Sequence, residues 1–296
     1  MCFPGKITHF YSVFLHLMNT LSLQTTWPVV MGIVNTTPDS FYSPSRCNRP
    51  EDVVARLLQM QSQGAAVVDI GACSTRPDAS LPSVQEEWAR LEPVLRAIRQ
   101  YLTENGPNAL PPLSLDTFRP HIVEKAYNLI GPFWVNDVQA GAEDPAMLPL
   151  VAQLGLPWVA MHQLPYQNPD AVFAFFQNVL ERAYKAGIRD VILDPGFGFH
   201  KTEAQNYALL QALDQWTPSR PSGTIPLLVG ISRKRMTYKP FGLTPDNALE
   251  ITSALHLQLL FKGASILRVH DVPSAVHIVN LFQKMTIFGP NSSPNR

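Results

Sequence analysis

Short apolar runs recur along this chain at intervals that fit one strand plus one helix, and a polar residue follows each run. The runs are rich in β-branched residues and apolar on both faces, which is typical of parallel strands buried inside a ring of helices. The stretches between them carry apolar residues at helical spacing and a polar outer face. The predicted strands are Val29–Val34, Ala66–Ile70, Leu113–Leu115, Phe133–Val135, Trp158–Met161, Val191–Leu193, Leu227–Ile231 and Ser265–Val269.

This eightfold alternation predicts an α/β fold, a single (β/α)8 TIM barrel with a short extra N-terminal segment. A doubly wound sheet is disfavoured because no GxGxxG pattern follows the first strand, and 296 residues suit one barrel domain. We expect the barrel over residues 27–286 and a disordered tail over 287–296. Residues 1–26 are expected to be an N-terminal extension, either disordered or the product of a misassigned start, because their apolar run makes a poor signal peptide and is too short for a membrane span.

Composition narrows the function classes. The formal net charge is zero, which argues against broad binding of nucleic acid. The three cysteines, Cys2, Cys47 and Cys73, are scattered and form no CxxC pattern. They are read as free thiols of a reducing compartment, so we expect a cytoplasmic protein that does not associate with membranes.

The polar residues after the apolar runs should meet at one place, because the C-terminal ends of the strands of a barrel surround a single cavity. Asn35 offers an amide oxygen of the kind that can ligate Mg²⁺ beside waters and phosphates, although taken alone its segment is an ordinary loop start. Asp116, Asn136 and Asp194 close three buried strands and would form a polar wall suited to a planar heterocycle. One of the three alone could equally be a helix cap.

Cationic and aromatic residues follow other strands. Arg76 presents a planar fork for a carboxylate or phosphate, or is a solvated loop arginine. Two further strand ends occupy the positions that commonly bind phosphate in barrels, one with Ser232 and Lys234, the other with Arg268 and His270. Phe199 lies in a glycine-rich stretch and can pack against a flat ligand. His162 is expected to be a packed, structural histidine.

Seven ordered motifs together resemble the dihydropteroate synthase family of folate biosynthesis, from about residue 29 to about residue 282. A set of ordered motifs along one barrel is far more specific than any one of them. The motifs are Met31-Gly32-Ile33-Val34-Asn35-Thr36-Thr37-Pro38-Asp39-Ser40-Phe41, Ser74-Thr75-Arg76-Pro77, Ser114-Leu115-Asp116-Thr117, Asn136-Asp137-Val138, Asp194-Pro195-Gly196-Phe197-Gly198-Phe199, Ser232-Arg233-Lys234 and Arg268-Val269-His270-Asp271-Val272.

The resemblance implies a transferase that condenses 6-hydroxymethyl-7,8-dihydropterin diphosphate with 4-aminobenzoate and releases diphosphate, an activity that sulfonamides target. It implies Mg²⁺ as cofactor, with Asn35 as its ligand, and a homodimer packed through outer helices. It gives catalytic roles to Asp194, Lys234 and Arg268, and diphosphate binding to Asn35, Arg268 and His270. The implied pterin residues are Asp116, Asn136, Met161, Asp194, Phe199 and Lys234, and the implied 4-aminobenzoate residues are Phe41, Thr75, Arg76, Pro77, Ser232 and Lys234.

Several positions depart from the family pattern without removing any residue given a chemical role: Cys73, Gln139, Ala140, Gln163, His200 and Arg235. In particular, Ala140 and His200 stand where the family generally has glycine. Two alternatives stay open, namely a methyltetrahydrofolate-type methyltransferase barrel and a synthase-like protein that binds pterin without turning it over. The loops over 35–46 and 73–81 are expected to be mobile until substrates bind.

Overall fold

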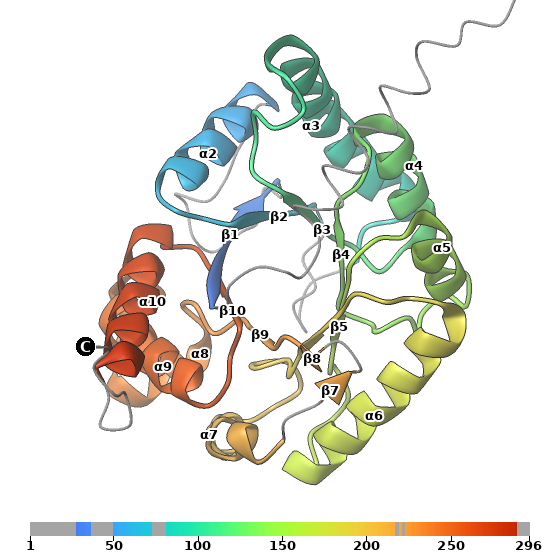
Figure 1. The fold of residues 1–296 in the computed structure, drawn as a ribbon. Helices are drawn as coiled ribbons and strands as arrows, with labels where there is room; N and C mark the ends of the chain where they lie inside the picture. Colours follow the sequence, from blue (N-terminus) through green and yellow to red (C-terminus); the bar gives the residue numbers. More distant parts are fainter. Residues whose placement is uncertain (1–27, 37–49, 73–80, 217–218, 221–222, 289–296) are drawn as a thin grey trace, which may run out of the picture.

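Eight parallel strands form an inner ring, and helices surround it (Figure 1). The computed structural model describes residues 28–36, 50–72, 81–216, 219–220 and 223–288. The strand order is β6-β5-β4-β3-β2-β1-β10-β9, and a parallel bridge between Leu193 and Leu227 joins the two ends of the sheet. This confirms the predicted TIM barrel.

Each predicted strand is present in the structure, and four of the eight end on a polar residue, namely Asn35, Asp116, Asp137 or Asp194. The seventh is shorter than predicted, because only two of its residues join the ladder beside β10. The barrel strands are β1 Val29–Asn35, β2 Val67–Gly71, β3 Leu113–Asp116, β4 Trp134–Asp137, β5 Trp158–Met161, β6 Val191–Asp194, β9 Leu228–Val229 and β10 Ile266–Val269; a separate hairpin pairs β7 Ser219–Arg220 with β8 Gly223–Thr224.

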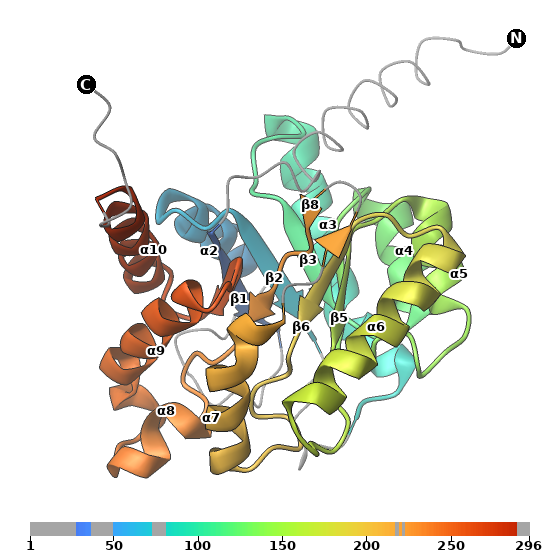
Figure 2. The same ribbon diagram turned by 60° about the horizontal axis from the view of Figure 1, so that its bottom comes forward.

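The helices of the outer ring lie between consecutive strands, so every crossover returns to a parallel neighbour (Figure 2). Glycine ends several of them: the αL conformation of Gly155 after α5 and of Gly187 after α6 lets the chain turn back into the sheet. The helices are α2 Pro50–Ser62, α3 Val84–Asn105, α4 Pro120–Ile130, α5 Met147–Leu154, α6 Pro169–Ala186, α7 Glu203–Ala212, η2 Leu213–Gln215, α8 Arg235–Tyr238, η3 Lys239–Phe241, η4 Pro245–Asn247, α9 Leu249–Phe261 and α10 Val272–Ile287.

The barrel core fills in layers. Its lower layer is an apolar cluster drawn from seven strands, whereas the main core lies between the strands and the helices. Alternate residues along each strand point inward, so the inward positions above that layer are the ones that reach the C-terminal rim. The cluster consists of Met31, Val67, Trp134, Val159, Ile192, Leu228 and Ile266.

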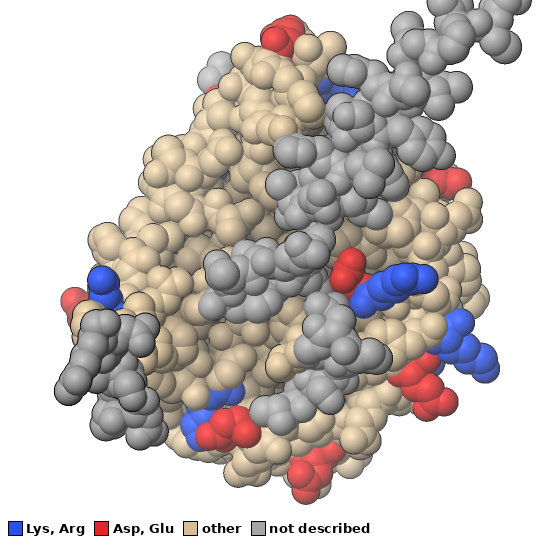
Figure 3. Space-filling model, in the orientation of Figure 1, with Lys and Arg blue, Asp and Glu red and all other residues tan. Residues whose placement is uncertain are grey.

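On the face seen in Figure 3, the charged side chains of the described residues are scattered singly or in small mixed groups rather than gathered in a patch of one sign. Among the helices that the structure describes, none has the length and apolar character needed to cross a bilayer.

Candidate active site

The polar strand ends lie level with one another at the rim. Strand register places Asn35 beside Gly71, Gly71 beside Asp116, and Asp116 beside Asn136, while Met161 lies beside Asp194. A Cβ on Gly71 would come within 3.4 Å of Asp116 Cβ and 3.8 Å of Asn35 Oδ1. The absence of a side chain at Gly71 therefore keeps the space between these two residues open.

A buried ionic network connects this row to β10, which pairs with β1 on the side away from β2. Asp69, on β2 and fully buried, accepts hydrogen bonds from Arg268 Nε at 2.7 Å and Asn136 Nδ2 at 2.9 Å. Arg268 Nη2 lies 2.6 Å from Asp69 Oδ2 and 3.0 Å from Asp116 Oδ2. The guanidinium of Arg268 thus bridges two carboxylates, and one of them also orients the Asn136 amide.

Asp69 is a site residue that the sequence interpretation missed. It lies inside the run Val67-Val68-Asp69-Ile70, and a carboxylate within an apolar strand must find a partner because an unpaired buried charge is costly. That signal was present in the sequence. The identity of the partner was not, because Arg268 is 199 positions away along the chain.

Two carboxylate oxygens of this network lack a partner among the described residues. Asp69 Oδ1 and Asp116 Oδ1 are both buried without a hydrogen bond, so both oxygens are available to accept one from a ligand or a water molecule. Burial raises the pKa of Asp116 to about 7, with Arg268 acting against the shift and Asp69 adding to it. The wall therefore has acceptor atoms ready for the N–H groups of a heterocycle.

Asp194 closes the wall from β6. Its Oδ1 accepts the Gly196 N–H at 2.8 Å, and burial raises the pKa of its carboxyl although the charge of Lys234 opposes the shift. Gly196 has φ of +68°, and a Cβ there would lie 2.0 Å from the carbonyl oxygen of His162. Only glycine fits this turn, so the sequence after β6 is required to bring Asp194 and Phe199 to the rim.

Lys234 faces the same cavity from the chain that follows β9. Its Nζ donates to the Phe197 carbonyl oxygen at 2.6 Å and lies 4.6 Å from the centre of the Phe199 ring. Burial lowers the pKa of Lys234 to about 8, and the charge of Asp194 opposes the shift. No hydrogen bond joins Asp194 to Lys234 among the described contacts, so the two residues interact through their charges.

A second lysine supports the loop after β6 from behind. Lys201 Nζ donates to the carbonyl oxygens of Gly196 at 2.9 Å, Phe199 at 3.2 Å and His162 at 3.3 Å, and it lies 3.3 Å from His162 Nδ1. Burial lowers the pKa of His162 to about 4, with Lys201 adding to the shift. His162 is buried with its ring edge-on to Phe175, which agrees with the structural role expected for it.

The two phosphate-binding candidates meet at the ends of β9 and β10. Ser232 Oγ lies 3.2 Å from His270 Nδ1 and accepts the His270 backbone N–H at 3.2 Å. Arg233, at φ of +54°, forms a two-point ion pair with Asp271 at 2.7 and 2.8 Å. Because Arg233 and Asp271 are the chain neighbours of Ser232 and His270, this ion pair fixes the two segments to each other.

Some of the remaining predicted site residues lie in the part of the chain that the structure describes, and others do not. Met161 packs with Phe118 and Val138, and partly buried Phe199 covers this cluster, which gives the cavity an apolar side. Phe41, Thr75, Arg76 and Pro77, together with Cys73 and most of the loops expected to be mobile, lie outside the described residues.

Some departures from the family pattern have a structural counterpart. Gln163 Nε2 donates to Gln139 Oε1 at 2.5 Å, so these two unusual residues contact each other across neighbouring loops. Ala140 and His200, which stand at usual glycine positions, have φ of +49° and +46°. The backbone therefore keeps a conformation that favours glycine at both places.

Metal binding through protein side chains alone has little support at the rim. The described residues contain no group of three or more His, Cys, Asp or Glu side chains that could hold an ion. The Asn35 amide oxygen lies at the open side of the row, across Gly71 from Asp116. This sparse donor set fits Mg²⁺, which keeps most of its waters and takes further ligands from substrate phosphates.

The fold and rim together define a class of protein: a TIM-barrel enzyme whose cavity offers acceptors for a heterocycle, an aromatic cover and cations for an anionic group. Comparison with known proteins refines this class. Residues 31–270 match the model of the family described as pterin binding enzyme, so the chain belongs to the pterin-binding enzyme family.

Several proteins similar to this chain are dihydropteroate synthases. The chain is 35% identical to the dihydropteroate synthase of Escherichia coli strain K12, over 88% of this chain and 93% of that protein. Among solved structures, it is similar to Xanthomonas albilineans dihydropteroate synthase with 4-aminobenzoic acid (36% identity, TM-score 0.76, 88% and 93% of the two chains). It is also similar to Burkholderia cenocepacia dihydropteroate synthase complexed with 7,8-dihydropteroate (31% identity, TM-score 0.76, 89% and 92%). The resemblance drawn from the motifs is confirmed.

Proposed function

We propose that this chain is a dihydropteroate synthase that joins 6-hydroxymethyl-7,8-dihydropterin diphosphate to 4-aminobenzoate in folate biosynthesis. The observation that carries the proposal is the single wall formed by Asp116, Asn136 and Asp194. Lys234 supplies a positive charge that interacts with the carboxylate of Asp194. Identity of 35% along nearly the whole length of a synthase supports the same reaction. A barrel that transfers methyl groups from a folate would have no use for the Ser-Arg-Lys segment.

The pterin ring would lie against this wall. The unpartnered oxygens Asp69 Oδ1 and Asp116 Oδ1 accept its N–H groups, and the Asn136 amide is held in one orientation by Asp69. Met161 and Phe199 enclose the apolar edge of the ring. Asp194, which is buried, would hold the ring, and the electron-rich pterin ring would share the positive charge that develops on its methylene carbon.

The diphosphate would lie beside the pterin ring, near Arg268, His270 and Asn35. Arg268 Nη1 makes no hydrogen bond among the described residues, whereas Nε and Nη2 face carboxylates, so Nη1 is the atom available to a phosphate oxygen. Burial lowers the pKa of His270 to about 3, with Arg268 adding to the shift, so its imidazole is neutral and donates from one ring nitrogen. Asn35 would hold Mg²⁺, which supplies neutralisation of the negative charge on the departing diphosphate.

The reaction needs no protein nucleophile. The amine nitrogen of 4-aminobenzoate attacks the methylene carbon, its electron pair forms the new carbon–nitrogen bond, and the carbon–oxygen electron pair leaves with diphosphate. The amine then loses one proton to solvent. Lys234 and Ser232, with Phe41, Thr75, Arg76 and Pro77 as further candidates, would orient the aminobenzoate, which places the two reactants in line.

Replacement of Asp194 tests this proposal. The Asp194→Ala variant should lose pterin diphosphate affinity and turnover to dihydropteroate, because it removes the charge that faces Lys234 and the developing cation. Asp214→Asn is the matched control, since Asp214 is a half-exposed partner of Lys262 on the outer surface. Unchanged pterin affinity and turnover in Asp194→Ala would show that the site is assigned wrongly.

We also propose that the chain forms a homodimer through α9 and α10. Large apolar side chains are exposed along these neighbouring helices, including Phe261 (51%), Leu281 (45%) and Ile287 (59%). Phe261 packs edge-on against Phe282 at 5.1 Å, so the patch is continuous between the two helices, and a patch of this kind favours protein contact. Light scattering should give a dimer that Leu281→Glu converts to a monomer; a monomeric unaltered chain would contradict this.

The cytoplasmic location expected from the cysteines stays a prediction.

A further inference from the structure

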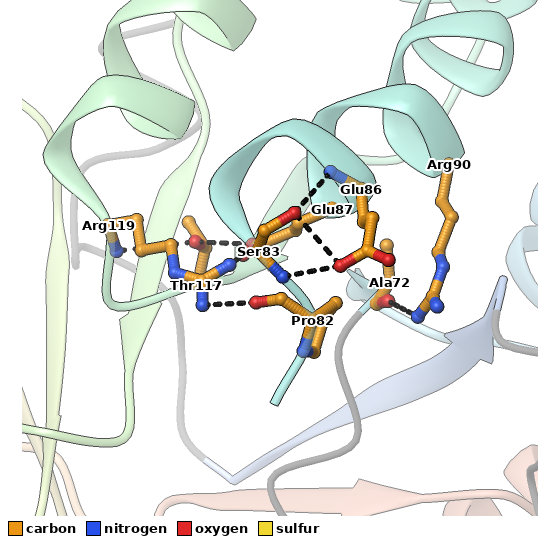
Figure 4. Close-up of polar contacts among 8 residues, drawn as sticks. All are labelled: Ala72, Pro82, Ser83, Glu86, Glu87, Arg90, Thr117 and Arg119. Atoms are coloured by element: carbon orange, nitrogen blue, oxygen red, sulfur yellow. Dashed lines mark hydrogen bonds and ion pairs between the residues drawn. The ribbon is translucent and has the colours of Figure 1, made fainter. Parts of the chain in front are cut away.

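A buried carboxylate on α3 takes no part in the chemistry proposed above. Glu87 is fully buried, accepts the hydroxyl of Thr117 at 2.7 Å and pairs with Arg119 Nη1 at 2.6 Å (Figure 4). Both of its oxygens are therefore occupied by side chains of the segment that follows β3. An ion pair in such a place is weak evidence for stability, because desolvation offsets the attraction. The position that Glu87 imposes on this segment is a better guide to its role.

Thr117 connects Glu87 to the polar wall of the cavity. It directly follows Asp116, is buried, and donates its backbone N–H to the Asn136 carbonyl oxygen at 3.1 Å. Its hydroxyl donates to Glu87 and accepts the Arg119 backbone N–H at 3.3 Å. The hydroxyl thus has one defined acceptor and one defined donor, and the chain at the end of β3 is held beside Asn136.

Arg119 connects Glu87 to the apolar side of the same cavity. Its guanidinium carbon lies 5.2 Å from the centre of the Phe118 ring, and Phe118 packs in the cluster that contains Met161. Arg119 Nη2 also donates to the Pro82 carbonyl oxygen (Figure 4). The planar fork of Arg119 allows one side chain to make all these contacts, so the guanidinium is held in one place against the Phe118 ring.

The segment 116–119 therefore has two sides. Asp116 belongs to the polar wall and Phe118 to the apolar cluster, whereas Thr117 and Arg119 both contact Glu87 on α3. Such alternation is expected of extended chain. Burial is the main cause of the raised pKa of Asp116, and the negative charge of Glu87 adds to the shift. The two carboxylates are thus close enough for their charges to interact.

We propose that Glu87 is a positioning residue for the pterin substrate. By holding Thr117 and Arg119, it sets where the segment 116–119 places its two cavity residues. This rests on the proposed function, in which the ligand of the wall is a pterin. Glu87 itself contacts no substrate. Its effect is on the fraction of molecules in which both cavity residues are correctly placed, and apparent affinity falls in proportion to that fraction.

Two substitutions at Thr117 separate positioning from packing. Thr117→Val keeps the shape of the side chain but removes the hydroxyl, whereas Thr117→Ser keeps the hydroxyl and removes a methyl group. We expect the Kd for the pterin diphosphate, from isothermal titration without 4-aminobenzoate, to rise about tenfold in Thr117→Val and to stay within about twofold in Thr117→Ser, because only the first loses a charge-assisted hydrogen bond. A side chain that only filled the core would give the reverse order.

Glu87→Gln tests the contact with Arg119. Its amide nitrogen would face the guanidinium as a second donor, so we expect the Kd for the pterin diphosphate to rise about tenfold here as well. The matched control is Glu92→Gln on the same helix, where Glu92 forms an exposed pair with Arg96 at 2.6 Å, and it should leave this Kd unchanged. The KM for 4-aminobenzoate, at saturating pterin diphosphate, should stay within about twofold in every variant.

Direct binding decides this inference separately from the proposed function. If the unaltered chain binds pterin diphosphate without aminobenzoate-dependent turnover, the proposed function fails and the Kd values still decide the inference. Unchanged affinity in Thr117→Val or in Glu87→Gln overturns it, as does an unaltered chain that binds no pterin. An equal loss of affinity for both substrates together with a lower Tm also overturns it, because that pattern indicates a merely structural role. Should Glu87→Gln fail to fold, the comparison of the two Thr117 variants decides.

Discussion

Replacing Asp69 with asparagine should weaken both the fold and the pterin site. Asp69 Oδ2 faces Arg268 Nε at 2.7 Å, Arg268 Nη2 at 2.6 Å and Asn136 Nδ2 at 2.9 Å, and the residue is fully buried. The asparagine side chain has nearly the same shape as that of aspartate but carries no charge. The two bonds from Arg268 keep a charged donor but each loses the part of its ~1.5–3 kcal/mol that comes from the opposite charge, and the bond from Asn136 becomes a neutral one worth ~0.5–1.5 kcal/mol.

The weakened bonds together predict a loss of about 3 kcal/mol in the free energy of unfolding, close to the ~3–5 kcal/mol typical of breaking a buried ion pair. Asp116 still pairs with Arg268 in this variant, so the barrel should fold. Affinity for the pterin diphosphate should fall about tenfold or more, because Arg268 and Asn136 lose their common anchor.

Urea denaturation followed by circular dichroism measures the stability, and isothermal titration measures the binding. Glu92→Gln provides the control, since Glu92 lies in an exposed pair on α3, and it should leave both quantities unchanged. If Asp69→Asn matched the unaltered chain in stability and in pterin affinity, the buried network would not be what orients the wall.

Three further predictions concern the loops and the lysine. Ala140→Gly should raise the free energy of unfolding by about 0.5–1 kcal/mol in urea denaturation, because Ala140 has φ of +49°; a loss of stability would contradict this. Gly196→Ala should lower kcat/KM about 100-fold or more in steady-state assays, since its Cβ would lie 2.0 Å from the His162 carbonyl oxygen; near-normal activity would refute the turn geometry. The logarithm of kcat/KM for the pterin diphosphate should fall as the pH rises above about 8, because Lys234 has a pKa of about 8 and binds as the cation; a profile that stays level from there to about pH 9.5 would exclude a required Lys234 charge.

The sequence predicts the barrel well because its signal is local. Each strand is a short apolar run with a polar residue at or soon after its end, and the register of parallel neighbours then brings Asn35, Asp116 and Asn136 level without further information. The positions where the family generally has glycine are also set by the local backbone conformation. Ala140 and His200 keep positive φ because hydrogen bonds around them hold the loop, as where Asp137 accepts the N–H groups of Gln139 and Gly141.

The sequence does not predict which side chains contact each other when the two residues lie far apart along the chain. Arg268 was predicted from its strand end as a diphosphate ligand, yet two of its nitrogens face Asp69 and Asp116, which lie 199 and 152 positions away. Glu87 looks like any surface carboxylate near the start of an amphipathic helix. Its burial follows from how α3 packs beside α4 and the end of β3, which only the three-dimensional structure reveals.

The proposed reaction transfers the pterin methylene to an amine. The most direct measurement is diphosphate release from 6-hydroxymethyl-7,8-dihydropterin diphosphate with Mg²⁺, in the presence and absence of 4-aminobenzoate. We expect release that requires 4-aminobenzoate and matches dihydropteroate formation mole for mole. Tight binding of the pterin diphosphate with no release on addition of 4-aminobenzoate would contradict it and identify a pterin-binding protein without synthase activity.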